Sequence, residues 1–333
     1  MEKIAFINGG TFIYWSSIVM GLAVVAAVCA FVALYCQKSG NWFGAGVMIP
    51  LGICSSLVLS RLIHWYCRTD SYASLTAAMT DYSWGGYALM GVFGACILCA
   101  CLLRVLKIIK NLPEMLDAMA LAGGLGIAVG RLASFYNTSD RGILMNESIG
   151  LPFAYPITNP VSGVVENRLA TFMLQAIVTG AIVLVLLVWY LICRMRKKQM
   201  KDGDVCLLFL ACYGSSQILF DSTRYDSLFM RSNGFVSIVQ ILGLIGLVLA
   251  IVLFSVRLVK NKGMKGWFVA LWIPLLASLG LAGYMEYHVQ RHGDQAMFAY
   301  SFMSLGLVIA LALMIAIRWI AESAKKEICV TEE

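Results

Sequence analysis

Arg131 is the residue whose type and position most clearly suggest a chemical role, because it ends an apolar run that carries no other charge after Asp117. An arginine at the centre of a membrane helix costs ~2.5–3.5 kcal/mol on insertion scales, so we expect it to face protein or a watery cavity and to meet an anion. The natural anion in a bilayer is a lipid phosphate. The simpler alternative is an arginine that extends to the interface. The polar run that follows cannot continue an apolar span and contains Asn137, Asp140, Arg141 and Gly142.

A second polar pattern begins within the apolar run 205–220 and extends just beyond it. Its four members recur at spacings of 4, 4 and 3 and are Tyr213, Gln217, Asp221 and Arg224. On a helix these side chains fall within ~80° of arc, so the pattern predicts one polar stripe facing a cavity. Alternatively, Asp221 and Arg224 could pair with each other at the i, i+3 spacing.

The composition indicates what kind of elements must position these residues. The chain has 333 residues, of which 60% are hydrophobic and 13% charged, with a mean hydropathy of +0.82. These values are outside the range of soluble globular domains and predict an all-α polytopic membrane helix bundle. Counting two marginal runs, 118–130 and 205–220, we expect about nine transmembrane segments. The longer uncharged runs are 12–35, 42–60, 82–103, 169–193, 232–256, 266–285 and 295–317.

Lys and Arg concentrate in alternate loops, which marks those loops as cytoplasmic. The sequence therefore predicts an N-terminus outside and a cytoplasmic C-terminus. The net charge of +7 follows from this bias, so we expect no nucleic-acid partner. The basic loops are 38–41, 104–110, 194–201, 257–265 and 318–326.

The eleven cysteines include no C-x-x-C backed by a second pair, so neither disulfides nor a metal site is expected. His64 lies near the end of the second apolar run, where it is most simply an interfacial histidine. Tyr14 and Trp15 at the start of the first run are typical of an interfacial aromatic belt. We expect no cofactor and no metal.

From about Tyr14 to Leu253 the sequence resembles the prolipoprotein diacylglyceryl transferases of bacteria. That family's central signature is a Gly-Arg followed by an aromatic-Asn run and then a Gly. The stretch from Gly130 to Asn137, followed by Gly142, is similar to it. Further resemblances, in chain order, are Tyr14, Arg61-Leu62, Gly85-Gly86 with Gly91, Asp117, the segment 170–175, and Arg224 to Leu228 with Gln240 downstream.

The resemblance implies a multi-pass enzyme of the bacterial cytoplasmic (inner) membrane, surrounded by membrane lipid. It implies transfer of the diacylglyceryl group of phosphatidylglycerol to the cysteine thiol of a prolipoprotein signal peptide, or a paralogous transfer to another acceptor, with release of glycerol phosphate. On this basis the candidate catalytic residues are Arg131, Tyr14 and Asp221. The candidate substrate-binding residues are Arg224, Asn137, Gly142, Gln217, Tyr213, Ser134 and Arg61. The identity of the base stays open among Tyr14, Asp117 and Asp221.

Several positions depart from the family pattern. Ser134 replaces an Asn, Ser139 and Gln175 each replace a Glu, Gln217 replaces a phosphate-holding Arg, Asp221 replaces a Glu, and Met90 replaces a His or Tyr. The two spans after residue 265 are additional to the family's usual seven. We therefore divide the chain into a transferase-like membrane core, 1–262, and an added two-span hairpin with a cytoplasmic tail, 263–333.

Two alternative functions follow from other features of the sequence. A non-catalytic lipid-binding membrane protein that retains the fold is suggested by the altered positions. A small transporter is suggested by the intramembrane charges and Gly-rich spans, but we find no internal repeat of the sort many transporters show.

Overall fold

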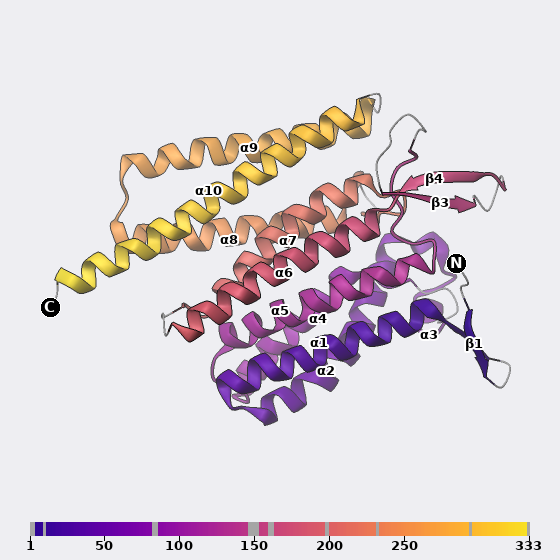
Figure 1. The fold of residues 1–333 in the computed structure, drawn as a ribbon, viewed down its shortest axis with the longest axis horizontal. Coiled ribbons are helices and arrows are strands. Elements are labelled where there is room, and N and C mark those ends of the chain that lie inside the picture. The colour runs from indigo at the N-terminus through magenta and orange to yellow at the C-terminus, as the bar shows by residue number, and fades with distance from the viewer. Residues whose placement is uncertain are drawn as a thin grey trace. The chain divides into compact units, whose positions relative to one another are not determined.

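The computed structural model describes residues 4–8, 11–81, 86–145, 153–158, 163–196, 200–230, 233–292 and 295–331. The chain is mainly helical, with three short antiparallel hairpins (Figure 1). The α-helices are α1 (Trp15–Ser39), α2 (Trp42–Cys67), α3 (Leu75–Thr80), α4 (Leu89–Val105), α5 (Leu112–Arg131), α6 (Thr171–Met195), α7 (Asp204–Thr223), α8 (Ile238–Lys262), α9 (Gly266–His292) and α10 (Ala296–Thr331). The hairpins pair β1 (Ile4–Asn8) with β2 (Thr11–Tyr14), β3 (Ala154–Thr158) with β4 (Val165–Leu169), and β5 (Phe229–Met230) with β6 (Asn233–Ser237). Short 3-10 turns lie at η1 (Thr69–Ser71) and η2 (Leu132–Phe135).

Eight helices in the described part of the chain are long and apolar enough to cross a membrane, and α4 is a shorter apolar helix. This confirms the prediction of a polytopic helical membrane protein. Both marginal runs are spans, since α5 and α7 contain them. The third span is shorter than the run 82–103 predicted, because Gly86 adopts a left-handed φ of +79° and Ala88 is extended.

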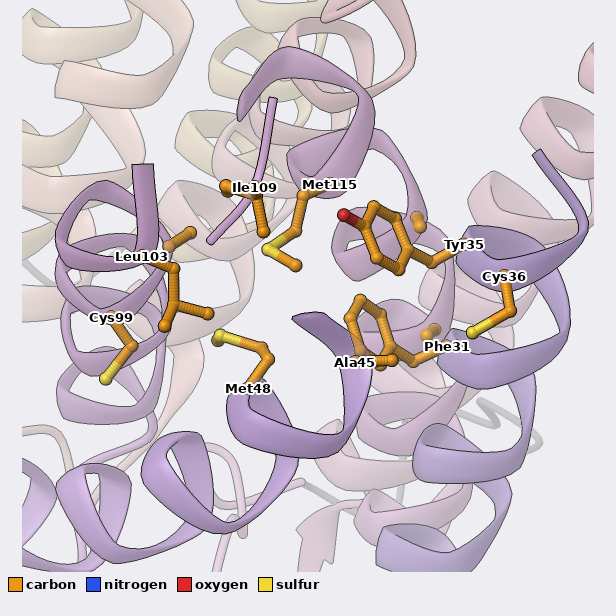
Figure 2. Close-up of a cluster of buried hydrophobic side chains, with 12 residues drawn as sticks. Phe31, Tyr35, Cys36, Ala45, Met48, Cys99, Leu103, Ile109 and Met115 are labelled. Carbon is orange, nitrogen blue, oxygen red and sulfur yellow. The ribbon is translucent and has the colours of Figure 1, made fainter. Parts of the chain in front are cut away.

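The chain forms two compact units. The first contains α1 to α6, the first turns of α7 up to Phe209, and residues 223–239. Within it α1 packs on α5, α5 on α6, and α2 on α4. Figure 2 shows a buried cluster that joins α1, α2, α4 and α5, in which the rings of Phe31 and Tyr35 stack 5.5 Å apart. Met48 and Met115 contribute flexible thioethers to the same cluster, which suits an irregular interior.

At one end of the first unit, polar contacts join three loops. Asp202 forms an ion pair with Lys38 and accepts a hydrogen bond of 2.6 Å from Asn111. The Asp117 carboxylate accepts the backbone N–H groups of Gly203 and Cys206, each at 2.8 Å, at the start of α7. Asp117 therefore has the structural role of a helix cap supplied by another helix. These contacts hold together three loops that the charge pattern assigns to the same side of the membrane.

The second unit contains residues 210–222 of α7, α8 from Gln240 onward, α9 and α10. In it α9 packs on α10. The backbones of α7 and α8 approach so closely that a Cβ on Gly214 would lie 2.4 Å from the Gly243 carbonyl oxygen. The predicted division between a 1–262 core and a 263–333 addition stays a prediction.

Gly91 is the clearest test of helix packing in the first unit. A Cβ there would lie 2.3 Å from Ser60 Cα, so Gly91→Ala forces α2 and α4 apart. Overpacking of this sort costs ~1–3 kcal/mol, and we expect a lower melting temperature for the purified protein in detergent. Gly46→Ala on α2 is the matched control, because a Cβ at Gly46 meets nothing within 4 Å. Equal melting temperatures for Gly91→Ala and wild type would contradict this packing.

Candidate active site

The Asp140 carboxylate lies between two guanidinium groups. Its Oδ1 accepts hydrogen bonds from Arg131 Nη1 at 2.6 Å and forms an ion pair with Arg224 Nη2 at 2.8 Å. Its Oδ2 accepts a hydrogen bond from the Ser134 hydroxyl at 3.0 Å. The three charged side chains are only 12–13% exposed. The anion that Arg131 was expected to meet is therefore, in this structure, a carboxylate of the same chain.

Asp226 completes a set of alternating charges. Its Oδ1 accepts a hydrogen bond from Arg224 Nε at 2.9 Å, and its Oδ2 accepts the Asp140 backbone N–H at 3.0 Å. We call Arg131, Asp140, Arg224 and Asp226 the arginine–aspartate cluster. Its formal charges sum to zero, which is how four ionised groups can lie in a largely buried place.

The local fold explains how Asp140 reaches this position. The helix α5 ends at Arg131, and η2 continues the chain to Phe135. Asp140 then adopts a left-handed φ of +57°, a conformation that Asp tolerates better than most residues. Its carbonyl accepts the Phe172 N–H at 3.1 Å, so the turn is tied to the start of α6.

Gly142 lies where three segments meet. It forms a bridge with Arg224, and its N–H donates to the Leu169 carbonyl at 2.8 Å. A Cβ at Gly142 would lie 2.5 Å from Thr171 Oγ1, so a side chain would push these segments apart. In its described part, the segment between this turn and α6 contains the β3–β4 hairpin (Figure 1).

Arg141 stabilises this turn through contacts with its backbone. Its Nη2 donates to the carbonyls of Ser134 at 2.7 Å and Asn137 at 2.6 Å. Its guanidinium lies between two aromatic rings, 4.3 Å from the Tyr155 centroid and 4.5 Å from that of Phe172. Burial lowers the pKa of the Arg141 guanidinium, an effect that Tyr155 and Asp140 oppose. Arg141 therefore holds the Ser134–Asn137 segment in place through cation–π and hydrogen-bond contacts.

The electrostatics of Asp140 follow from its neighbours. Burial alone would raise the pKa of this carboxyl, but the charges of Arg131 and Arg224 outweigh burial. Hydrogen bonds from Arg131 and Ser134 act in the same direction, so the pKa lies well below its ordinary value. Asp140 is therefore ionised throughout the physiological range.

A cavity of about 290 Å³ adjoins the cluster in the first unit. Asp226 belongs to both, since it lines the cavity and binds Arg224. On the cavity wall the Tyr72 hydroxyl lies 2.9 Å from His64 Nδ1. The lining residues are His64, Arg68, Ser71, Tyr72, Gly86, Asp226 and Leu228.

Arg61 was predicted to bind substrate, and its geometry favours a structural role. It is 1% exposed, and it donates to the carbonyls of Ala78 at 2.5 Å and Gly86 at 3.0 Å, and to that of Asp81. Its guanidinium also lies over the rings of Tyr72 and Tyr87, each 5.2 Å from the centroid. Arg61 thus joins α2 to α3 and to the segment before α4.

The structure brings some of the predicted site residues together. Arg131, Ser134 and Arg224 meet at Asp140, while Asn137 and Gly142 lie in the same turn. Tyr14 is at the N-terminal end of α1 and is 45% exposed. Its neighbour Trp15 stacks on Tyr136, 6.1 Å between centroids.

The predicted helical stripe is wrong in one respect. The helix α7 ends at Thr223, so Arg224 is not on it; the bridge to Gly142 takes Arg224 out of the helix. Tyr213, Gln217 and Asp221 are buried residues of the second unit. The structure gives Arg224 the partners Asp140 and Asp226.

Sequence reasoning missed the parts played by Asp140, Asp226 and the His64–Tyr72 pair. The available signal for Asp140 was its place one residue after Ser139, where the family carries a carboxylate. Gly85, one of the residues that carried the resemblance, lies outside the described residues.

The charge cluster predicts a specific acid sensitivity. Since the folded pKa of Asp140 is below the unfolded value of ~3.9, its contribution to stability is fully present above that value and is lost as the pH falls through the folded pKa. Asp140→Asn should cost ~3–5 kcal/mol at neutral pH, because it leaves two buried guanidiniums facing each other, and should flatten the acid limb of a melting-temperature profile.

The control for this change is Glu166→Gln, which removes the carboxylate of a hairpin ion pair with Arg168. Ion pairs near the surface contribute ~0–1 kcal/mol, so this variant should melt close to wild type. An Asp140→Asn protein that melts like Glu166→Gln at pH 7 would contradict the central role of Asp140.

Comparison with known proteins identifies the relatives of this chain. Residues 3–256 match the family model described as prolipoprotein diacylglyceryl transferase. The phosphatidylglycerol–prolipoprotein diacylglyceryl transferase of Clostridioides difficile strain 630 is 25% identical over 271 residues, covering 79% of this chain and 98% of the relative. Enzymes of the same name match from Clostridium botulinum strain Langeland, at 24% over 79% of this chain and 99% of the relative, and from Streptococcus pyogenes serotype M5, at 25% over 66% and 79%. This multi-pass membrane protein belongs to the prolipoprotein diacylglyceryl transferase family, a family of transferase enzymes.

Proposed function

We propose that this protein transfers the diacylglyceryl group of phosphatidylglycerol to the cysteine thiol of a prolipoprotein, with release of glycerol phosphate. The named activity of its relatives and the family match over residues 3–256 support the reaction class. The observation that carries the proposal is the pair of arginines, Arg131 and Arg224, fixed by Asp140 beside a cavity.

The chemistry requires a cation at the phosphate. Sulfur attacks the glyceryl carbon, the C–O bond to phosphate breaks, and the leaving group takes the electron pair. Positive groups already in place stabilise that developing charge without reorganisation. Arg131 and Arg224 supply such groups, and the planar guanidinium can bind two phosphate oxygens at once. Asp140 and Asp226 act by orienting them.

The altered signature is consistent with an active site. Ser139 stands at the position where family members carry Glu, and it is exposed. The next residue, Asp140, turns inward on its left-handed backbone and provides a carboxylate between the arginines. We infer that the carboxylate function has moved by one residue rather than being lost.

The location of the site suggests its side of the membrane. The arginine–aspartate cluster lies at the end of α5 opposite to Asp117 and the loop that contains Asp202. Since the basic loops 38–41, 104–110 and 194–201 are assigned to the cytoplasm, the site faces the outer side of the bacterial cytoplasmic membrane. A secreted prolipoprotein would present its cysteine there.

Arg131→Ala tests the proposal directly. Purified protein is supplied with phosphatidylglycerol vesicles and a prolipoprotein peptide that contains one cysteine, and thioether product and glycerol phosphate are measured. Loss of a charge-assisted contact of ~1.5–3 kcal/mol should lower kcat/KM by about 10- to 100-fold or more. Arg194→Ala is the matched control, since this arginine lies at the far end of α6 and donates to the Gln37 carbonyl.

Two outcomes would contradict the proposal. Full turnover by Arg131→Ala would remove Arg131 from the phosphate site. Wild-type protein that retains phosphatidylglycerol without converting it, and that fails to rescue a bacterium depleted of its own transferase, would favour non-catalytic lipid binding instead.

A further inference from the structure

The cavity beside the cluster contains a group suited to proton transfer. Among its lining residues, the Tyr72 hydroxyl is paired with His64, and Asp226 is engaged by Arg224 and by the Asp140 N–H. His64 is the lining residue whose type exchanges a proton near neutral pH. A nucleophilic thiol needs such a group, because the thiolate is the reactive form.

His64 is held in a defined orientation. It lies in the last turn of α2, and its Nδ1 is 2.9 Å from the Tyr72 hydroxyl. The two rings also meet edge to face, 5.8 Å apart at 88°. When Nδ1 carries the hydrogen of this bond, Nε2 is the basic nitrogen, so Tyr72 can fix the tautomer that accepts a proton.

The backbone beside His64 is shaped to admit the ring. Gly86 has a φ of +79°, and a Cβ there would lie 3.0 Å from His64 Cε1 and 2.4 Å from the Tyr72 hydroxyl. The charged and titratable groups around His64 are Arg61 from α2, Arg68 directly after that helix, Tyr72 from the following loop, and Asp226 on the cavity lining. This is a more constrained setting than the interfacial position that the sequence suggested.

We propose that His64 is the general base that accepts the proton of the acceptor thiol; this role rests on the transfer reaction proposed above. The proton passes from sulfur to Nε2, a C–S bond forms at the glyceryl carbon, and the C–O bond to phosphate breaks with its electron pair on oxygen. The imidazolium then returns the proton to the released phosphate or to water. Atoms and charge balance without another reactant.

The cavity connects this base to the arginines. Asp226 lines the cavity and accepts a hydrogen bond from Arg224 Nε at 2.9 Å. A lipid whose phosphate lies on the arginine side would therefore present its glyceryl carbon toward the cavity. The thiol enters from the His64 side, which places nucleophile and leaving group on opposite sides of the reacting carbon, as displacement requires.

His64→Gln and His64→Ala test the role in the assay described above. We expect kcat to fall by at least about 100-fold, because a general base contributes ~10²–10⁴-fold. The KM for phosphatidylglycerol should stay within about twofold, since the arginines are untouched. His288→Gln, the same exchange on α9, is the matched control and should leave kcat unchanged.

Chemical rescue distinguishes a base from a structural residue. Added 4-methylimidazole should restore the rate of His64→Ala in a saturable way, and the rate without it should rise about tenfold per pH unit toward the thiol pKa of ~8.5. Tyr72→Phe should lower kcat, and a cooperative melting transition should show that this variant remains folded.

The outcomes separate this inference from the function on which it rests. A wild-type protein without turnover overturns both. Wild-type turnover with a full rate in His64→Gln overturns the role of His64 alone. Loss of rate together with loss of the folded state, and no response to 4-methylimidazole, identifies His64 as structural and also overturns the role.

Discussion

The position of one carboxylate, Asp140, constrains the end of the first unit at which α5 terminates. Its contacts join the end of α5, through Arg131, to the segment after α7, through Arg224. Its main chain is tied to Asp226 and to the start of α6. A buried guanidinium without a counter-ion is costly, and removal of one partner from such a pair typically costs ~3–5 kcal/mol. The turn, the bridge at Gly142 and the end of α7 are arranged so that this carboxylate is in place.

The same constraint explains why an irregular polar loop can follow directly on the apolar span of α5. Non-helical backbone in a membrane protein is tolerated when protein groups satisfy its hydrogen bonds. Arg141 does this for Ser134 and Asn137, and the segment 142–145 pairs with 167–169 beside the β3–β4 hairpin. The polar residues that interrupt the apolar pattern therefore satisfy one another, and the helices around them remain regular.

Much of the architecture could be predicted from the sequence, because long apolar runs have few structures open to them in a bilayer. That Arg131 must meet an anion could also be predicted, because a charged arginine in an apolar span has a high free-energy cost. That the anion is Asp140 did not follow, since it depends on one left-handed residue and on a partner at position 224. The end of α7 at Thr223 likewise depends on a bridge to Gly142, which no helical periodicity reveals. The His64–Tyr72 contact forms across a turn of irregular backbone, so spacing alone gave no signal.

The arginine–aspartate cluster has no net formal charge, and this affects how readily a transferase of this kind can release its phosphate product. A phosphatidylglycerol phosphate carries about one negative charge, whereas glycerol phosphate carries about two near pH 7, as its second pKa is ~6. Two unopposed arginines would therefore bind the product more tightly than the substrate and slow its release. With Asp140 and Asp226 between and beside them, the arginines retain directed donors but little net attraction for a dianion. Such an arrangement keeps directed donors on the phosphate oxygens while it limits the hold on the released product, so product release slows kcat less than two unopposed arginines would.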